Sequence, residues 1–147
     1  MEKESSRNDL GFNKDDKIII YVGRIEPPKK VDTILKAMQI LTNQDKSYKL
    51  IVVGDGVLMN EVKSLASKLK LNDNIHFMGV RKRIELPQLF SSADVSVLIS
   101  GNEGSPLSVK ESLACGVPVV ANDVGDISKI VKDSKNGFIV NSENIYE

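Results

Sequence analysis

Two loops of the sequence carry charged side chains at spacings that suit a phosphorylated ligand. The first follows an apolar run that ends at Gly23, and it contains Arg24 and Lys29, five positions apart. Arginine grips phosphate oxygens with two parallel N–H bonds and lysine adds a point charge, so the pair suits a diphosphate. The same residues also fit solvated surface charges beside a proline-rich turn, and this loop alone favours neither interpretation.

The second loop carries two acids on either side of an expected helix start. Glu103 precedes the helix, and Glu111 lies roughly 7–9 Å along the helix axis from its first turn. A positive helix end with free backbone N–H groups separates the two carboxylates. The N–H groups near Leu107 and Ser108 can hold phosphate. Glu111 can accept hydrogen bonds from two ribose hydroxyls, and Glu103 can face a sugar.

This order of groups is the order of parts in a nucleotide sugar, namely ribose, diphosphate and hexose. Pro106 fits the first turn of a helix, where no partner is needed for a backbone N–H. A structural interpretation stays open, in which the helix dipole favours Glu103 and a neighbouring lysine pairs with Glu111 on a solvated face. The residues that lead into the helix complete the expected binding stretch, and they are Gly104, Ser105 and Pro106.

Other motifs narrow the choice of ligand. A Gly54-Asp55-Gly56 turn closes a second apolar run, and it allows either close backbone approach to a ligand or only a tight turn. The first apolar run is not followed by the glycine pattern of dinucleotide-binding proteins, and no P-loop pattern occurs. Asp123 and Asp126 have no further group of oxygen ligands beside them, so we expect no metal site. Without the dinucleotide-binding pattern we also expect no cofactor.

Apolar runs and amphipathic segments alternate along the chain and predict the scaffold for these loops. The expected strands are 18–22, 48–53, 75–78, 94–100, 117–121 and 138–140, and the expected helices are 31–41, 58–69, 86–93, 107–113 and 127–131. Strands separated by helices must be parallel and joined by right-handed crossovers. The sequence thus predicts an α/β fold, a doubly wound parallel six-stranded sheet of Rossmann-like order, with ligands at the carboxyl ends of the strands.

Composition limits the class of protein. The 147 residues carry 20 Lys and Arg against 20 Asp and Glu, which argues against nucleic acid as a partner. We expect a polar linker or arm over 1–16, with order beginning at Lys17, and one domain over 17–147. No apolar run approaches the ~20 residues of a bilayer span, and no signal-type stretch opens the sequence. With a lone cysteine, Cys115, these features predict a cytoplasmic protein.

Six segments together resemble, in order and spacing, the C-terminal donor-binding half of the retaining glycosyltransferases of family four. The likeness covers residues 8–140, and its most specific element is Glu103 and Glu111 with seven residues between them. The six segments are YVGRIEPPKKVDTILKAM, LIVVGDG, IHFMGV, ADVSVLIS, EGSPLSVKESLACGVPVVA and NGFIV.

The resemblance implies a GT-B architecture and sugar transfer from a nucleotide diphosphate donor with retention of configuration. In that pattern Arg24 and Lys29 neutralise the diphosphate leaving group. Glu111 binds the ribose, and Glu103 lies beside the donor sugar. Gly23 and Gly54 match the family's glycines that allow close backbone approach to the donor. Val80 and Arg81 match the residues that contact the nucleotide base.

The resemblance also implies partners for this chain. A complete enzyme of the family has an N-terminal acceptor-binding domain, so we expect this chain to start in an interdomain linker and to stop before the helices that close the fold. The isolated chain should bind nucleotide sugar without transferring it, because half of the cleft is missing. Membrane association of the full-length enzyme stays open. The alternative is a stand-alone nucleotide-binding or protein-interaction module without transfer activity.

Overall fold

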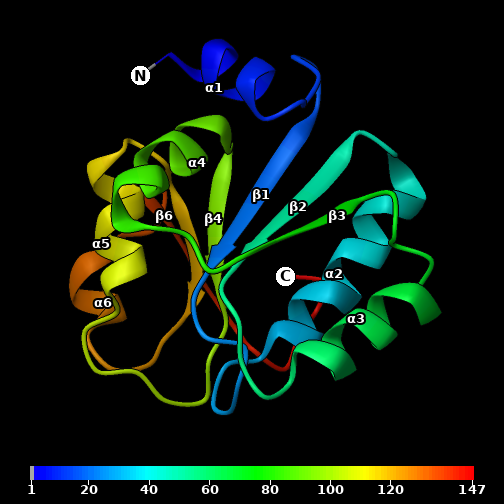
Figure 1. Cartoon of the computed structure of the whole chain (residues 1–147). Coiled ribbons are helices and arrows are strands. Elements are labelled where there is room, and N and C mark those ends of the chain that lie inside the picture. The colour runs from blue at the N-terminus through cyan, green and yellow to red at the C-terminus, as the bar shows by residue number, and fades with distance from the viewer. Residues whose placement is uncertain (1) are drawn as a thin grey trace.

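A six-stranded parallel sheet forms the centre of the molecule (Figure 1). The computed structural model describes residues 2–147. The strand order is β3-β2-β1-β4-β5-β6, so the chain reverses direction across the sheet between β1 and β4. This order confirms the predicted doubly wound α/β fold. The strands are β1 (Lys17–Val22), β2 (Tyr48–Val53), β3 (Ile75–Gly79), β4 (Val95–Leu98), β5 (Val119–Asn122) and β6 (Gly137–Val140).

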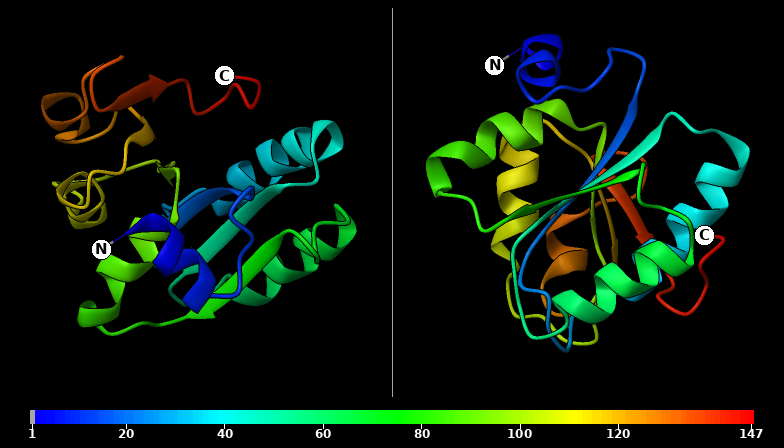
Figure 2. Two further views of the ribbon diagram at one scale, coloured as in Figure 1. Left: turned by 90° about the horizontal axis from the view of Figure 1, so that it is seen from above. Right: turned by 45° about the vertical axis from the view of Figure 1, so that its right-hand side comes forward.

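Helices cover both faces of the sheet, as right-handed crossovers require. Helices α2 and α3 lie on one face, and α4, α5 and α6 lie on the other (Figure 2). No helix in residues 2–147 combines the length and the apolar character that crossing a bilayer demands. The helices are α1 (Lys3–Asp9), α2 (Val31–Gln44), α3 (Met59–Lys68), α4 (Leu86–Ser92), α5 (Leu107–Ala114) and α6 (Ile127–Ile130), and a 3-10 turn, η1 (Arg83–Glu85), precedes α4.

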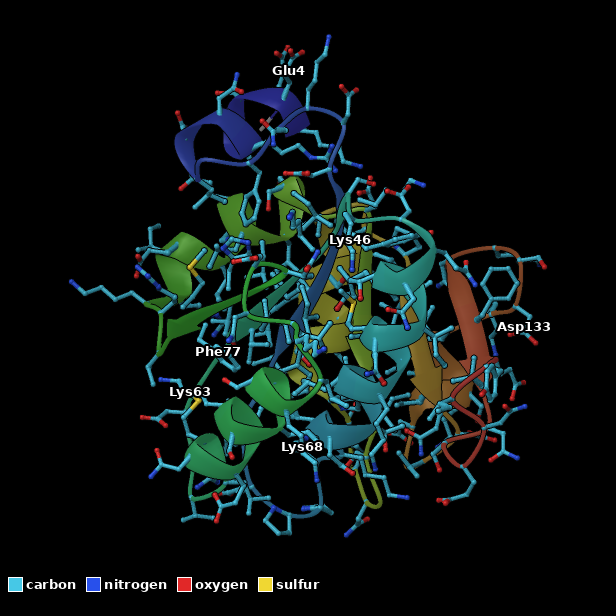
Figure 3. All side chains as sticks on the ribbon, turned by 90° about the vertical axis from the view of Figure 1, so that its right-hand side faces the viewer. Glu4, Lys46, Lys63, Lys68, Phe77 and Asp133 are labelled. Carbon is cyan, nitrogen blue, oxygen red and sulfur yellow. The ribbon has the colours of Figure 1, made fainter. Side chains whose placement is uncertain are left out.

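The strands bury side chains on both faces, as their continuous apolar runs predict. On β1, Ile18 and Ile20 pack into the cluster that contains Phe90 of α4, whereas Tyr21 packs with Leu35 of α2. At the β3 edge, Lys63 of α3 lies over the ring of Phe77, with its Nζ 5.5 Å from the ring centroid (Figure 3). Such a lysine stem covers apolar surface while its ammonium group stays in water.

The segment before β1 corrects one expectation. The arm expected over 1–16 is not unstructured in its described part, because residues Lys3–Asp9 form α1; Met1 lies outside the described residues. Arg7 is buried, and it donates hydrogen bonds to Ser92 O (2.9 Å), Lys14 O (2.7 Å) and Asp94 Oδ2 (2.7 Å). The buried side chain that anchors α1 is therefore an arginine, and Lys3 of the same helix also pairs with Asp94. Apolar periodicity does not detect such polar anchors. The role of residues 1–16 as an interdomain linker stays a prediction.

The fourth strand is shorter than the expected range 94–100, and the difference bears on the site. After Leu98 the backbone leaves the sheet and turns toward the loop between β1 and α2. Lys30 N donates to Ile99 O (2.8 Å), and Gly101 N donates to Pro28 O (2.9 Å). The residues after β4 thus pair with a neighbouring loop rather than with a strand.

Candidate functional site

Lys29 and Glu103 form an ion pair at the carboxyl end of the sheet. Lys29 lies in the loop between β1 and α2, and Glu103 lies in the loop between β4 and α5. Their side chains retain 18% and 9% of their full exposure. Charges so shielded from water interact more strongly than charges on an open surface. The structure therefore brings together two residues that the sequence predicts for one site.

Backbone hydrogen bonds and one buried side chain hold these two loops in place. Lys29 and Ser100 form an isolated antiparallel bridge. At the end of β5, the Asn122 side chain accepts from Ser100 N (2.9 Å) and donates to Ser100 O (2.7 Å). An amide that satisfies both backbone groups of one residue fixes that residue's position. Three strand ends, those of β1, β4 and β5, are thereby joined.

The loop between β5 and α6 packs against the backbone of Glu103 and Gly104. Asp126 N donates to Gly104 O (2.9 Å). A Cβ atom on Gly125 would lie 2.1 Å from Glu103 O, and Gly125 has a φ of +55°. Only glycine permits both this close approach and this backbone conformation. Asn122 and Gly125 are site-supporting residues that the sequence analysis missed; their position directly after the fifth expected strand was the available signal.

Glu111 lies on the second turn of α5, and its partner is not the neighbouring lysine of the structural interpretation. Arg83 of η1 pairs with it, with 3.5 Å between Arg83 Nε and Glu111 Oε1. The Glu111 side chain retains 20% of its exposure and that of Arg83 retains 78%. No motif singled out Arg83, although it lies only two residues beyond Arg81.

The start of α5 lies between the two acids, as the sequence predicts. Pro106 occupies the N-cap position, and no side chain caps the helix there. The first backbone N–H groups of a helix lack partners within the helix, so an uncapped start can bind an anion. The stretch that leads into this helix start is accessible at Gly104, Ser105 and Leu107, half-buried at Ser108 and buried at Pro106.

The structure separates Arg24 from the Lys29–Glu103 pair. Arg24 is exposed, and its Nε lies 3.0 Å from Glu26 Oε1 in the same loop. Tyr21 Oη donates to Arg24 O (2.7 Å), and burial, followed by the nearby carboxylates of Glu103 and Glu26, raises the pKa of Tyr21. Arg24 and Lys29 therefore lie in one loop but pair with different acids.

The remaining predicted residues occupy the same edge of the sheet. A Cβ atom on Gly54, whose φ is +134°, would lie 1.9 Å from Gly23 O, so packing of β2 against β1 already requires glycine there. Val80 is exposed, and Arg81 turns back to donate to Met78 O (3.0 Å). Contacts of these four residues with a ligand stay predictions. Among residues 2–147, no group of three His, Cys, Asp or Glu side chains is arranged to hold a metal ion.

A family model and individual relatives both identify this chain as similar to glycosyltransferases. The model of the family "Glycosyl transferases group 1" matches residues 2–147. An uncharacterised glycosyltransferase of Methanocaldococcus jannaschii is 31% identical over 143 residues, which cover 97% of this chain and 36% of that protein. A D-inositol 3-phosphate glycosyltransferase of Segniliparus rotundus is 30% identical over 145 residues, which cover 96% of this chain and 32% of that protein.

Solved structures share the fold. Sucrose-phosphate synthase from Thermosynechococcus elongatus superposes with a TM-score of 0.88 at 27% identity, over 99% of this chain and 37% of that one. HepE of Anabaena in complex with UDP superposes with a TM-score of 0.82 at 25% identity, over 93% of this chain and 38% of that one. The chain thus spans well under half of the length of its relatives. It belongs to the family of group 1 glycosyl transferases.

Proposed function

We propose that the chain forms the donor side of a retaining glycosyltransferase and that its site holds a nucleotide diphosphate sugar. The observation that carries the proposal is the shielded Lys29–Glu103 pair beside the uncapped start of α5, with Glu111 farther along the same helix. In this arrangement the diphosphate lies against Lys29 and the first N–H groups of α5. The ribose binds Glu111, and the sugar faces Glu103.

The proposed chemistry follows from where charge develops. When the bond between the sugar and the diphosphate breaks, negative charge grows on the leaving phosphate oxygen. Lys29 and the N–H groups of α5 are held in place before the reaction, and such fixed donors stabilise developing charge most effectively. Arg24 can join them, because its exposed pair with Glu26 is of a kind that contributes only about 0–1 kcal/mol.

The family supports further parts of this proposal. Because the chain spans only 36% and 32% of two relatives, we propose that an N-terminal domain holds the acceptor and that the chain alone binds donor without transferring sugar. Retention of configuration and action in the cytoplasm are also part of the proposal. Binding through basic side chains and helix N–H groups needs no cofactor, so we expect affinity to be independent of divalent metal.

Titration calorimetry tests the proposal directly. UDP, GDP, ADP and their sugars are titrated into the chain with and without EDTA. At least one of these nucleotides should bind equally well in both conditions. A charge-assisted hydrogen bond contributes about 1.5–3 kcal/mol, so Glu111→Ala should weaken binding roughly 10- to 150-fold. Arg24→Ala should also weaken it.

Glu4→Ala is the matched control, because Glu4 is an exposed acid on α1, which lies at the opposite end of β1 from the site (Figures 1 and 3). This variant should bind as the unmodified chain does. If the folded chain binds none of the nucleotides, the proposal is wrong and the interaction-module alternative replaces it.

A further inference from the structure

The ion pair between Arg83 and Glu111 links two segments that are distant in the sequence. Arg83 opens η1, just after β3, whereas Glu111 belongs to α5, on the far side of β4 in the chain. Their joined atoms are Nε and Oε1, 3.5 Å apart. The cation that pairs with Glu111 therefore comes from a segment beside the place where the nucleotide base is expected.

The helix itself supplies no cation at the positions that would face Glu111. Neighbours on one helix face are three and four residues apart. At these spacings Glu111 has Leu107, Ser108, Ala114 and Cys115, none of which is basic. Cys115 lies one helical turn after Glu111, and burial, followed by the negative charge of Glu111, raises the pKa of its thiol. Arg83 is the cation that the structure pairs with this carboxylate.

The geometry of the pair leaves acceptor capacity for a ligand. A carboxylate has two oxygens, each with two acceptor sites, and Arg83 approaches Oε1. Oε2 and the remaining acceptor site of Oε1 can then serve a ligand. Arg83 also offsets the negative charge of Glu111, which would otherwise repel a nearby diphosphate.

We infer that Arg83 is a positioning residue, which orients the Glu111 carboxylate for the ribose hydroxyls and so makes the site prefer ribonucleotides over 2′-deoxyribonucleotides. This inference rests on the proposed function, in which Glu111 binds the ribose. A carboxylate that is already oriented loses less rotational freedom when the ligand binds. The gain applies only to a ligand that has both hydroxyls.

The test compares the dissociation constants of UDP and 2′-deoxy-UDP, because UDP is bound in a solved relative. The same pairs of GDP and ADP are measured in parallel, so that the identity of the base does not decide the result. The unmodified chain should prefer the ribonucleotide at least tenfold. Arg83→Gln should reduce that preference three- to tenfold by weakening ribonucleotide binding more than 2′-deoxyribonucleotide binding, which should weaken no more than it does in Lys82→Gln. Arg83→Lys should restore part of the preference.

Lys82→Gln is the matched control, since it removes one positive charge from the adjacent exposed position. It should change both dissociation constants by the same factor. If Glu111→Gln abolishes the ribose preference and Arg83→Gln does not, the inference about Arg83 is overturned while the proposed function stands. Tighter ribonucleotide binding by Arg83→Gln, or no preference in the unmodified chain, also overturns it. If the folded chain binds no nucleotide, both proposals fall.

Discussion

Two of the ion pairs at the carboxyl end of the sheet, Lys29–Glu103 and Arg83–Glu111, differ in how firmly the scaffold holds them. Lys29 and Glu103 are both shielded, and their loops are joined by backbone hydrogen bonds and by the Asn122 amide. Arg83 is mostly in water, at 78% of its full exposure, whereas its partner Glu111, at 20%, is about as shielded as Lys29. One end of the proposed binding site is thus a shielded pair in loops joined to three strand ends, and the other end depends on an exposed arginine.

This contrast shows at which end of the site the protein fixes charge before a ligand arrives. Removing one partner of a shielded pair lowers the unfolding free energy of the protein strongly, because the other charge is left without compensation. An exposed pair contributes little and is screened by salt. In the proposed function the fixed end holds the diphosphate and sugar, where bonds break, and the adaptable end holds the nucleoside, which only binds.

The largest effect should follow from disturbing the support of the fixed pair. Gly125→Ala places a Cβ atom 2.1 Å from Glu103 O at a φ of +55°. A left-handed conformation costs a non-glycine residue about 1–2 kcal/mol, and overpacking adds about 1–3 kcal/mol, so we expect a loss of about 3 kcal/mol in unfolding free energy. Urea denaturation measures it. Gly104→Ala is the control, because its Cβ meets nothing within 4 Å, and an equal loss there would contradict the explanation.

A smaller loss should follow from breaking the fixed pair itself. Lys29→Met leaves Glu103 shielded without its cation. Because both side chains keep some exposure, we expect a loss of about 2 kcal/mol, below the roughly 3–5 kcal/mol of a fully buried pair. The double variant Lys29→Met/Glu103→Leu removes the stranded charge and should recover at least half of the loss. If the double variant is less stable than the single one, the pair stabilises the fold by more than charge compensation.

The sequence predicts most of the fold because the signal is local. Strand β2 begins at Tyr48 and ends at Val53, as predicted, and the helix expected from residue 31 forms as α2 and buries an apolar face. The short β4 and the helix α1 were not predicted. In the first case the backbone after Leu98 pairs with a loop 70 residues earlier in the sequence, and in the second the anchoring side chain is Arg7, which periodicity treats as surface.

The site could be predicted in its residue types but not in its pairings. Charges in loops after strands indicate an anion site, and Lys29 and Glu103 do meet there. Which basic side chain pairs with Glu111 depends on the path of the chain from β3 into η1. No local sequence pattern predicts that path. The same path turns Arg81 back toward Met78 O and leaves Arg83 facing α5.

The smallest effect should come from the exposed pair. Arg83→Gln should change the unfolding free energy by no more than about 0.5 kcal/mol, because the arginine is mostly solvated and gives up little packing. A double-mutant cycle with Glu111→Gln, read by thermal denaturation at low and high salt, should give a coupling below about 1 kcal/mol that vanishes as salt rises.

A coupling as large as that of Lys29 with Glu103 would mean that both ends are equally fixed. A small one leaves Arg83 free to act on the ligand rather than on the fold, because a contact that adds little to stability can still decide the direction in which Glu111 points.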